Sequence, residues 1–385
     1  AADNETLVRT GPGTPMGALF RQFWIPVCLS RELPEPDGPQ IRLKVLGEEL
    51  LAFRGTDGRV GLIDRRCRHR GADLYYGRNE ACGVRCAYHG WKFDADGRCV
   101  DAPTMEPEHV QRLGDKTRIR AYPAREWGDF VWACLSAEPA AELPMMEFAL
   151  VPPSHRYVSK KFQECNWAQA AEGAVDTAHF SFLHMPVAQS ATDLPDKARR
   201  ATRGYSPKTM GTDHVRWMRD DPRPKYHIAK HEAGMALGAS RKADDGRLYW
   251  RIAQYLMPSH AYTPSAVPGE TYHGQTFVPV DDENCWVYVY SWNPSRPLTD
   301  EERASYAGGG AVYPEMDASY MPVRNRANEY LLDRRLQKTE NFTGIIGVSE
   351  QDACIQDSQG RILSLIHISE PTRRTPISYA VFCLK

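Results

Sequence analysis

The chain has 385 residues, of which 42% are hydrophobic and 25% charged, and its formal net charge is −1. This length allows two domains with a sizeable core, and the near balance of charge gives no electrostatic reason to expect nucleic acid or a membrane as partner. No apolar run approaches the roughly 18 residues that would span a bilayer. The ten cysteines are too sparse for a disulfide scaffold, so we expect a reducing, cytoplasmic location.

The strand and helix patterns predict an α+β chain with two domains. Alternating apolar and polar residues from Ile41 to about Val100, with turns at GEE and at Asp96-Gly97, predict a small β domain at residues 23–137. Residues 1–22 are expected to form an N-terminal segment that packs on the second domain. The second domain, residues 138–362, has helical patterns at 162–185 and 320–340 and strand patterns between 247 and 293.

Two stretches of the β domain carry four candidate metal ligands, Cys67 and His69 in CRHRGA and Cys86 and His89 in CAYHGW. Zinc accepts a tetrahedral set of Cys and His ligands, but a zinc finger usually offers its cysteines as one pair and its histidines as another. Here each stretch supplies one of each, which suits a Rieske [2Fe-2S] centre, where two thiolates bind one iron and two imidazoles the other. The spacing favours this cluster, with zinc or no metal at all as the alternatives.

A second set of candidate ligands lies in residues 165–186, CNWAQAAEGAVDTAHFSFLHMP. On an ideal helix, His179 and His184 would point about 140° apart. They converge only if the helix is distorted or ends between them, and Pro186 is consistent with such an end. Glu172 and Asp176 precede the histidines at helical spacing. The alternative is a buried helix with hydrogen-bonded core histidines, but two histidines beside carboxylates favour a metal site.

Two histidines and one carboxylate leave positions open on a ferrous ion for O2, which is typical of non-haem iron oxygenases. The carboxylate must come from further along the chain. Residues 344–360, GIIGVSEQDACIQDSQG, offer Glu350, Asp352 and Asp357. We favour Asp352 as the ligand and expect Asp357 to be a solvated residue.

With both sets of ligands, the chain resembles the large subunit of a Rieske non-haem iron aromatic ring-hydroxylating oxygenase, close to the phthalate 4,5-dioxygenase group. The resemblance extends from LVRTGPGTPMG to QDACIQDSQGRI and rests on the two Cys/His stretches, the CNW lead-in, the E-x3-D-x2-H-x4-H pattern and the late Gln-Asp. It implies an antiparallel β-sheet domain that holds the [2Fe-2S] cluster. It also implies a catalytic domain of helix-grip type, an antiparallel sheet with a long helix, that holds the mononuclear Fe(II).

The resemblance further implies a terminal oxygenase that uses O2 and electrons from NADH, delivered by a separate flavin and iron–sulfur reductase. The expected reaction is dihydroxylation of an aromatic carboxylate such as a phthalate, with O-demethylation of a methoxylated aromatic acid as the alternative. The resemblance also implies that the chain assembles as a homotrimer or as stacked trimers. In such an assembly, Asp176 would link His89 of the partner subunit to His179. The resemblance also implies that Glu172 tunes this bridge and that Asn166 lies near the iron.

A carboxylate substrate calls for a fork-shaped cation, and Arg251 in LYWRIAQYL is a candidate, although a surface or structural role is an equal alternative. Residues 363–385, LSLIHISEPTRRTPISYAVFCLK, resemble the in-frame translation of a sequencing-library adapter. The alternative is a genuine C-terminal strand, since ISYAVFCL has high β-propensity. We therefore leave His367 and Cys383 out of the site, and expect a catalytic domain truncated near Ile362 followed by a poorly packed tail.

Overall fold

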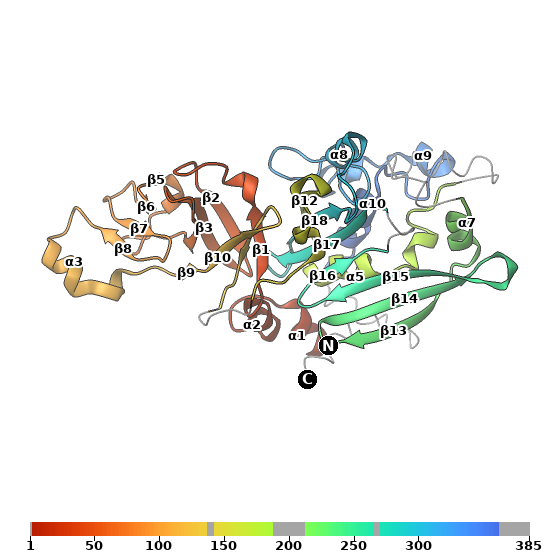
Figure 1. Ribbon diagram of the computed structural model, residues 1–385, viewed down its shortest axis with the longest axis horizontal. Helices are drawn as coiled ribbons and strands as arrows, with labels where there is room; N and C mark the ends of the chain where they lie inside the picture. The colour runs from red at the N-terminus through yellow and green to blue at the C-terminus, as the bar shows by residue number, and fades with distance from the viewer. Residues whose placement is uncertain (1, 137–141, 188–211, 265–269, 362–385) are drawn as a thin grey trace. The chain divides into compact units, whose positions relative to one another are not determined.

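A computed structural model describes residues 2–136, 142–187, 212–264 and 270–361 (Figure 1). Its internal contacts divide the chain into two compact units, residues 9–149 and residues 1–8 together with the chain from Leu150 onward. Residues 9–22, assigned above to the N-terminal segment, are grouped with the first unit. The adapter-like tail, and the prediction that it packs poorly, lie outside the described residues.

The first unit consists of three small antiparallel sheets. Its strands are β1 (Ile25–Leu29), β2 (Ile41–Val45), β3 (Glu48–Arg54), β4 (Val60–Asp64), β5 (Arg78–Glu80), β6 (Gly83–Arg85), β7 (Lys92–Asp94), β8 (Cys99–Asp101), β9 (Ala121–Tyr122), β10 (Ala124–Trp127) and β11 (Phe130–Ala133). Its helices are α2 (Pro15–Arg21), α3 (Pro107–Leu113) and, at the boundary, α4 (Glu147–Leu150). The strand orders are β1-β11-β10, β2-β3-β4-β9 and β5-β6-β7-β8.

The core of the first unit holds the two candidate cysteines. Phe53 on β3 and Ile63 on β4 lie in one buried cluster with Cys67 and Cys86. The predicted hairpin at Asp96-Gly97 connects β7 and β8, and Gly97 has a φ of 77° that favours glycine. These buried side chains place the cysteine of each Cys/His stretch in the hydrophobic core of the unit.

The second unit is built on a seven-stranded antiparallel sheet. Its strands are β12 (Arg156–Gln163), β13 (Lys225–His231), β14 (Gly234–Lys242), β15 (Leu248–Leu256), β16 (His260–Tyr262), β17 (Tyr272–Pro279) and β18 (Cys285–Trp292). Its helices are α1 (Ala2–Val8), α5 (Trp167–Val175), α7 (Thr212–Asp220), α8 (Asp300–Ala307), α9 (Arg334–Thr339) and α10 (Val348–Ser358). The strand order is β12-β18-β17-β16-β15-β14-β13.

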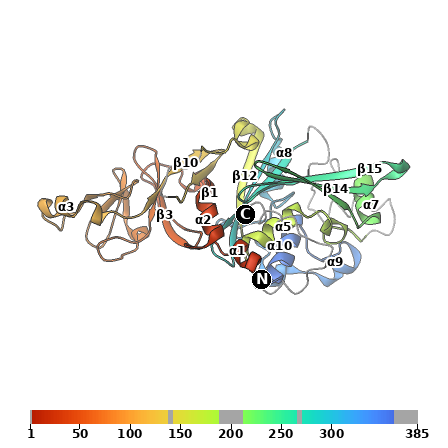
Figure 2. The same ribbon diagram turned by 90° about the horizontal axis from the view of Figure 1, so that it is seen from below.

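Helices cover one face of this sheet. Helix α5 packs on β15, β16 and β17, and α10 packs on α5; Figure 2 shows both helices on the same side of the sheet. This confirms the predicted fold of antiparallel sheet and covering helix. Within the described residues the longest helix is α10, with 11 residues, so two short helices share the role expected of one long helix. No helix in the described parts of the chain is long and apolar enough to cross a membrane.

The helix predicted at residues 162–185 is shorter and later than expected. Its beginning is part of β12, which pairs with β18 along its whole length. Helix α5 begins only at Trp167, because Asn166 caps its N-terminus, and it ends at Val175. Strand pairing in the sheet thus overrides the helical pattern at the start of this stretch.

The predicted helix at residues 320–340 is also wrong. A 3-10 helix, η7 (Arg326–Leu331), and helix α9 replace it, and within η7 Glu329 and Tyr330 have positive φ values of 51° and 56°. Asp333 caps α9 with its side chain. The buried Tyr330 packs with Ile345 and α10, so a tertiary contact breaks the amphipathic pattern into two pieces.

Candidate metal centres

Cys67 and Cys86 each begin a loop with the same backbone hydrogen bonds. The N–H of each cysteine donates to the carbonyl of the residue five positions on, at 2.9 and 2.8 Å. The N–H of the glycine four positions on, Gly71 or Gly90, donates to the cysteine carbonyl at 2.8 and 3.0 Å. Both glycines have φ near 70°, at 69° and 74°, where a side chain is strained. The two loops are therefore one structural motif used twice.

The four side chains of these loops gather in a partly buried site. Cys67 and Cys86 are buried free thiols, and burial, together with the neighbouring Cys86 thiol, raises the pKa of Cys67 to about 11. The ring centroids of His69 and His89 are 4.6 Å apart. The Nδ1 atom of His69 is buried without a hydrogen-bond partner. A buried polar atom without a partner is costly, so its free lone pair fits a ligand to iron.

The arrangement of these ligands distinguishes a two-iron cluster from a zinc ion. Four ligands of one tetrahedral zinc lie within about 4 Å of one another, because Zn–S and Zn–N bonds are about 2.3 and 2.0 Å. In the described residues, His179, His184 and Asp352 form a group whose ligand atoms all lie within 4.8 Å of one another. The ligand atoms of the two Cys/His loops do not form such a group. A [2Fe-2S] cluster spreads its ligands over two irons, so the loops fit the cluster and the zinc alternative is set aside.

Replacing Cys86 by serine is expected to remove the cluster, because a serine oxygen is a poor substitute for a thiolate in binding iron and sulfide. The purified variant will lack the visible absorption of the cluster and its EPR signal after reduction with dithionite. Cys99 →Ser is the matched control, since Cys99 lies on β8 in the same unit and belongs to neither loop. A Cys86→Ser protein that keeps both signals would contradict this assignment.

The second set of ligands converges because α5 ends before either histidine. Asn166 and Gln169 form a reciprocal capping box at the start of the helix. The helix ends at Asp176, whose ψ of 127° is extended, and a 3-10 helix, η5 (His179–Ser181), follows. The spacing predicted a distorted helix or a helix end between the two histidines, whereas α5 ends before both of them. His179 and His184 can therefore point to a common centre.

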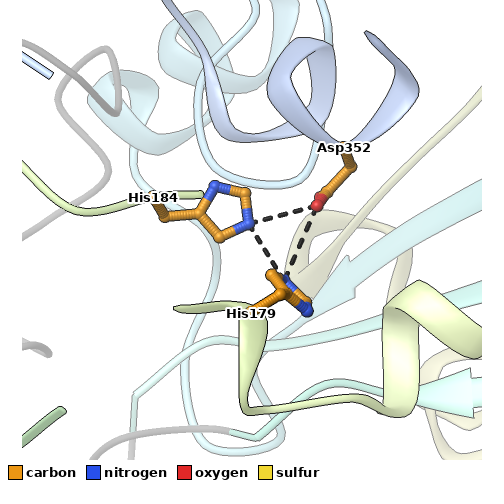
Figure 3. A group of neighbouring side chains, drawn as sticks. All are labelled: His179, His184 and Asp352. Atoms are coloured by element: carbon orange, nitrogen blue, oxygen red, sulfur yellow. Dashed lines mark hydrogen bonds and ion pairs between the residues drawn. The ribbon is translucent and has the colours of Figure 1, made fainter. Parts of the chain in front are cut away.

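Three ligand atoms meet at this centre, as Figure 3 shows. The Nε2 atoms of His179 and His184 are 3.1 Å apart. On α10, Asp352 places Oδ1 at 3.1 Å from Nε2 of His184 and 3.7 Å from Nε2 of His179. Ligands about 2.1 Å from one ion and at right angles to each other are about 3.0 Å apart. The three atoms therefore fit one face of the coordination sphere of a single metal ion.

The hydrogen bonds of the two histidines direct lone pairs toward this centre. Nδ1 of His179 lies 3.3 Å from Oδ2 of Asp176, and Nδ1 of His184 lies 2.7 Å from Oε1 of Gln351. Since oxygen acceptors face both Nδ1 atoms, the proton of each neutral ring sits there and Nε2 carries the lone pair. Two such lone pairs and a carboxylate oxygen repel one another at about 3 Å unless a cation lies between them. This donor set is that of a 2-His-1-carboxylate ferrous site.

Charges around Asp352 keep it in the form that binds a metal. Burial would raise the pKa of Asp352, but the positive charge that His184, His179 and Lys161 carry when protonated outweighs burial and lowers it. Lys161 is buried on β12, where its Nζ donates to the Ser349 hydroxyl at 2.5 Å. The carboxyl group of Asp352 is therefore ionised at neutral pH.

Asp176 lies at the rim of the centre and orients His179. Its Oδ1 accepts hydrogen bonds from the Ala178 N–H at 2.8 Å and from the Tyr226 hydroxyl at 2.7 Å. Burial alone would raise the pKa of Asp176, but hydrogen bonds from His179, Ala178 and Tyr226 hold it well below its usual range. The side chain remains 37% exposed. Asp176 is thus an ionised carboxylate that fixes the tautomer of a metal ligand and stays open to a further partner.

The structure does not bring Asn166 to this centre. Its amide nitrogen donates to the carbonyls of Val8 and Asp282, and its Oδ1 caps α5. The nine residues of α5, about 13 Å at 1.5 Å per residue, separate it from Asp176. The expected place of Asn166 near the iron is therefore wrong: it positions the helix that leads to the site.

Two other carboxylates from the sequence analysis lie outside the centre. Glu172 is half-buried on the last turn of α5 and does not line the pocket described below, so its tuning role stays a prediction. Asp357, expected to be solvated, is buried on α10 and accepts a hydrogen bond from the Tyr330 hydroxyl at 2.5 Å. The helical spacing of Asp357 places it against η7 rather than in solvent.

An open pocket lies over the three ligands. Its remaining wall is formed by Gly173, Ala174, Val175, Asp176, Thr177, Phe180, Arg251, Thr263, Pro264, Gln275, Ala311, Val312 and Val348. Most of this wall is apolar or small, which suits a flat hydrophobic ligand. Sequence reasoning missed nearly all of these residues, because nothing in a strand pattern shows which side chain faces a cavity.

The donor atoms of the two Cys/His loops and of His179, His184 and Asp352 are those expected of a Rieske non-haem iron protein. Two family models match the chain, Rieske [2Fe-2S] domain over residues 23–123 and LigXa C-terminal domain like over residues 136–366. The chain belongs to the family of Rieske oxygenases, as the oxygenase subunit. It is thus an oxidoreductase, a terminal oxygenase that uses O2, and its cofactors are a [2Fe-2S] cluster and mononuclear iron.

Individual relatives agree with this assignment. Over 374 residues the chain is 35% identical to the oxygenase subunit of 3-chlorobenzoate-3,4-dioxygenase from Comamonas testosteroni, covering 94% of this chain and 82% of the relative. It is 36% identical to the phthalate 4,5-dioxygenase oxygenase subunit of Pseudomonas putida, again over 374 residues, with 94% and 79% covered. In fold it is similar to the terminal oxygenase of carbazole 1,9a-dioxygenase from Nocardioides aromaticivorans IC177, with a TM-score of 0.61, 15% identity, and 99% and 95% of the two chains covered.

Proposed function

We propose that this terminal oxygenase hydroxylates the ring of an aromatic carboxylate, such as a phthalate or a chlorobenzoate. The observation that supports the proposal is the buried position of Arg251, on β15, in the wall of the pocket. Its side chain is 5% exposed and lines the pocket beside the three iron ligands. No carboxylate pairs with it in the described residues, and its Nε atom is buried without a hydrogen-bond partner.

A buried guanidinium without a counter-charge is unfavourable by several kcal/mol until an anion reaches it. The guanidinium of Arg251 lies over the Phe180 ring, with 4.4 Å between its Cζ and the ring centroid. Its Nη1 donates weakly to the Tyr249 hydroxyl, at 3.4 Å, which leaves donors free for a substrate. A carboxylate accepts two parallel bonds from such a fork. The apolar wall of the pocket can hold the aromatic ring while the carboxylate meets Arg251.

The metal groups would supply the electron transfer and O2 chemistry, and the protein would bind and orient the substrate. When bound, the cluster delivers single electrons and the mononuclear iron activates O2. His179, His184 and Asp352, all of which line the pocket, would hold the iron. Arg251 would fix the substrate, and the small and apolar wall residues would exclude water around the ring.

The assembly expected from the family is also part of the proposal. We infer a homotrimer or stacked trimers in which Asp176 links His179 to His89 of the partner subunit, and a flavin and iron–sulfur reductase that draws on NADH. The exposed, ionised carboxylate of Asp176, already bonded to His179, supports such a bridge. The domain boundaries at residues 22, 137 and 362, and a cytoplasmic location, are retained as predictions.

Arg251→Gln is expected to raise KM for aromatic carboxylates about 10- to 100-fold. The change removes a charged hydrogen-bond pair worth about 1.5–3 kcal/mol, and each 1.4 kcal/mol is about tenfold in affinity. Arg251→Lys should lie in between, because an ammonium keeps the charge but loses the fork. The measurement is O2 uptake coupled to a reductase, over benzene dicarboxylates, chlorobenzoates and methoxybenzoates.

Neutral analogues provide the control for this test. The methyl ester or amide of the best substrate should be a poor substrate for the wild type and should show little change in KM on Arg251→Gln. An equal rise in KM for acid and ester would contradict the proposed carboxylate contact. Product analysis distinguishes the two reactions: ring hydroxylation gives a hydroxylated ring, whereas O-demethylation releases formaldehyde.

A further inference from the structure

His184 is held from both sides of its ring by neighbouring residues of α10. Asp352 faces Nε2 at 3.1 Å, and the preceding residue, Gln351, faces Nδ1 with Oε1 at 2.7 Å. Gln351 is fully buried, with an exposed fraction of 0%. Two consecutive residues of α10 therefore contact the two ring nitrogens of His184, one with a carboxylate and the other with a neutral amide.

The surroundings of Gln351 determine which end of its amide meets His184. Its Nε2 donates to the carbonyl oxygen of Ile345 at 2.8 Å. A carbonyl only accepts, so a flipped amide would place two acceptor oxygens against each other. Oε1 must therefore face His184, and only the tautomer with the proton on Nδ1 can donate to it. Nε2 of His184 then carries its lone pair toward Asp352 and His179.

We propose that Gln351 is a positioning residue that fixes the tautomer and ring orientation of His184 for metal binding. This inference rests on the proposed metal centre at His179, His184 and Asp352. Without the amide oxygen, the buried Nδ1–H would lose its acceptor, and the ring could turn or move its proton to Nε2, where it would block the lone pair. Loss of such a hydrogen bond to a metal-binding histidine typically weakens metal affinity about 10- to 100-fold.

The two histidines of the centre are held by different chemistry. His179 donates to the ionised and partly exposed Asp176, whereas His184 donates to a neutral amide in the core. A neutral acceptor orients the ring without adding a second negative charge near Asp352. Because Gln351 is buried, it keeps His184 in place whatever binds to the exposed side of the site.

The test is metal affinity in the full chain with its cluster in place. The mononuclear site is emptied with a chelator, and Co(II) is titrated in against a competing chelator. Gln351→Leu should weaken Co(II) binding about 10- to 100-fold, while Ile345 keeps a donor because Asn341 also bonds its carbonyl at 3.0 Å. Gln351→Glu should recover most of the affinity, because a buried neutral carboxyl group donates its O–H to the Ile345 carbonyl and offers its other oxygen to Nδ1 of His184, as the amide does.

Gln356→Leu is the matched control, because Gln356 is a buried glutamine on the same helix that accepts from Gln163 rather than from a ligand. It should bind Co(II) like the wild type. Gln351→Met, closer to glutamine in shape, serves if the leucine variant does not fold. Wild-type affinity in a folded Gln351→Leu or Gln351→Met protein, or an equal loss in Gln351→Glu, would overturn the inference.

Failure of the metal centre itself gives a different result. In that case the wild type would bind no Co(II) at this site, and His179→Ala would change nothing. If wild type binds and His179→Ala does not, the centre stands, and only the Gln351 variants decide the positioning role. The absorption and EPR signals of the cluster should be unchanged in every variant, which reports separately on the first unit.

Discussion

Asp352→Ala is expected to abolish turnover and leave the [2Fe-2S] cluster intact. The change removes the one carboxylate of the ligand set, so the remaining two imidazoles hold Fe(II) weakly. Since loss of a supporting hydrogen bond alone costs about 10- to 100-fold, loss of a ligand should lower activity more than about 100-fold. The measurements are iron per chain after desalting and O2 uptake with reductase, compared with the visible spectrum of the cluster.

Asp357→Asn provides the control for this variant. Asp357 is a buried carboxylate on the same helix, but its partner is the Tyr330 hydroxyl rather than a metal ligand. An amide oxygen still accepts from Tyr330, so Asp357→Asn should keep its mononuclear iron and most of its activity. If both variants lost iron equally, the effect of Asp352 would be structural and the assignment of the third ligand would be wrong.

Asp176→Asn is expected to slow electron transfer from the cluster to the mononuclear site about 10- to 100-fold. The carboxylate accepts from His179, Ala178 and Tyr226, and in the proposed trimer it also accepts from His89 of the partner subunit. An amide has a single oxygen, and its NH2 group would face a donor. The rate is measured by stopped flow, as reoxidation of the pre-reduced cluster after mixing with substrate and O2.

Tyr226→Phe distinguishes the role of the Asp176 carboxylate itself from that of the hydrogen bond that Tyr226 donates to it. This variant removes one donor to Asp176 but keeps the carboxylate, so reoxidation should slow only a few-fold. Because Asp176 also orients the ligand His179, Asp176→Asn should bind iron more weakly, so both variants are loaded with excess Fe(II) and the rate is expressed per iron bound. Reoxidation of Asp176→Asn at the wild-type rate would contradict the bridge and with it the proposed path between subunits.

The sequence was most informative where function depends on residues close together in the chain. The Cys/His spacing of the two loops needs only a turn with a glycine at a positive φ, and that turn is the same at Gly71 and Gly90. The alternation of residues 41–100 correctly predicted strands there, and the hairpin at Asp96-Gly97. The five-residue step from His179 to His184 correctly raised the question of a helix end, because helix geometry is a local property.

The errors of the sequence reading have a common cause in contacts between distant segments. Strand β12 took the beginning of one predicted helix because β18 pairs with it. The buried Tyr330 interrupted another, because it packs with Ile345 and Ala353. Asn166 was placed near the iron by family resemblance, whereas its capping bonds and its contacts to Val8 and Asp282 give it a structural role.

The sequence by itself thus determined the ligand types, their local spacing and the presence of two domains with different folds. Only the tertiary structure decided that α10 brings Asp352 to His184, that Arg251 on β15 lines the pocket, and that Gln351 holds a ring nitrogen. The physical reason is the range of the interactions. Periodicity and turn chemistry follow from neighbouring residues, but the side chain that meets a given atom depends on how helices and sheet pack, and that packing sums contacts from the whole unit.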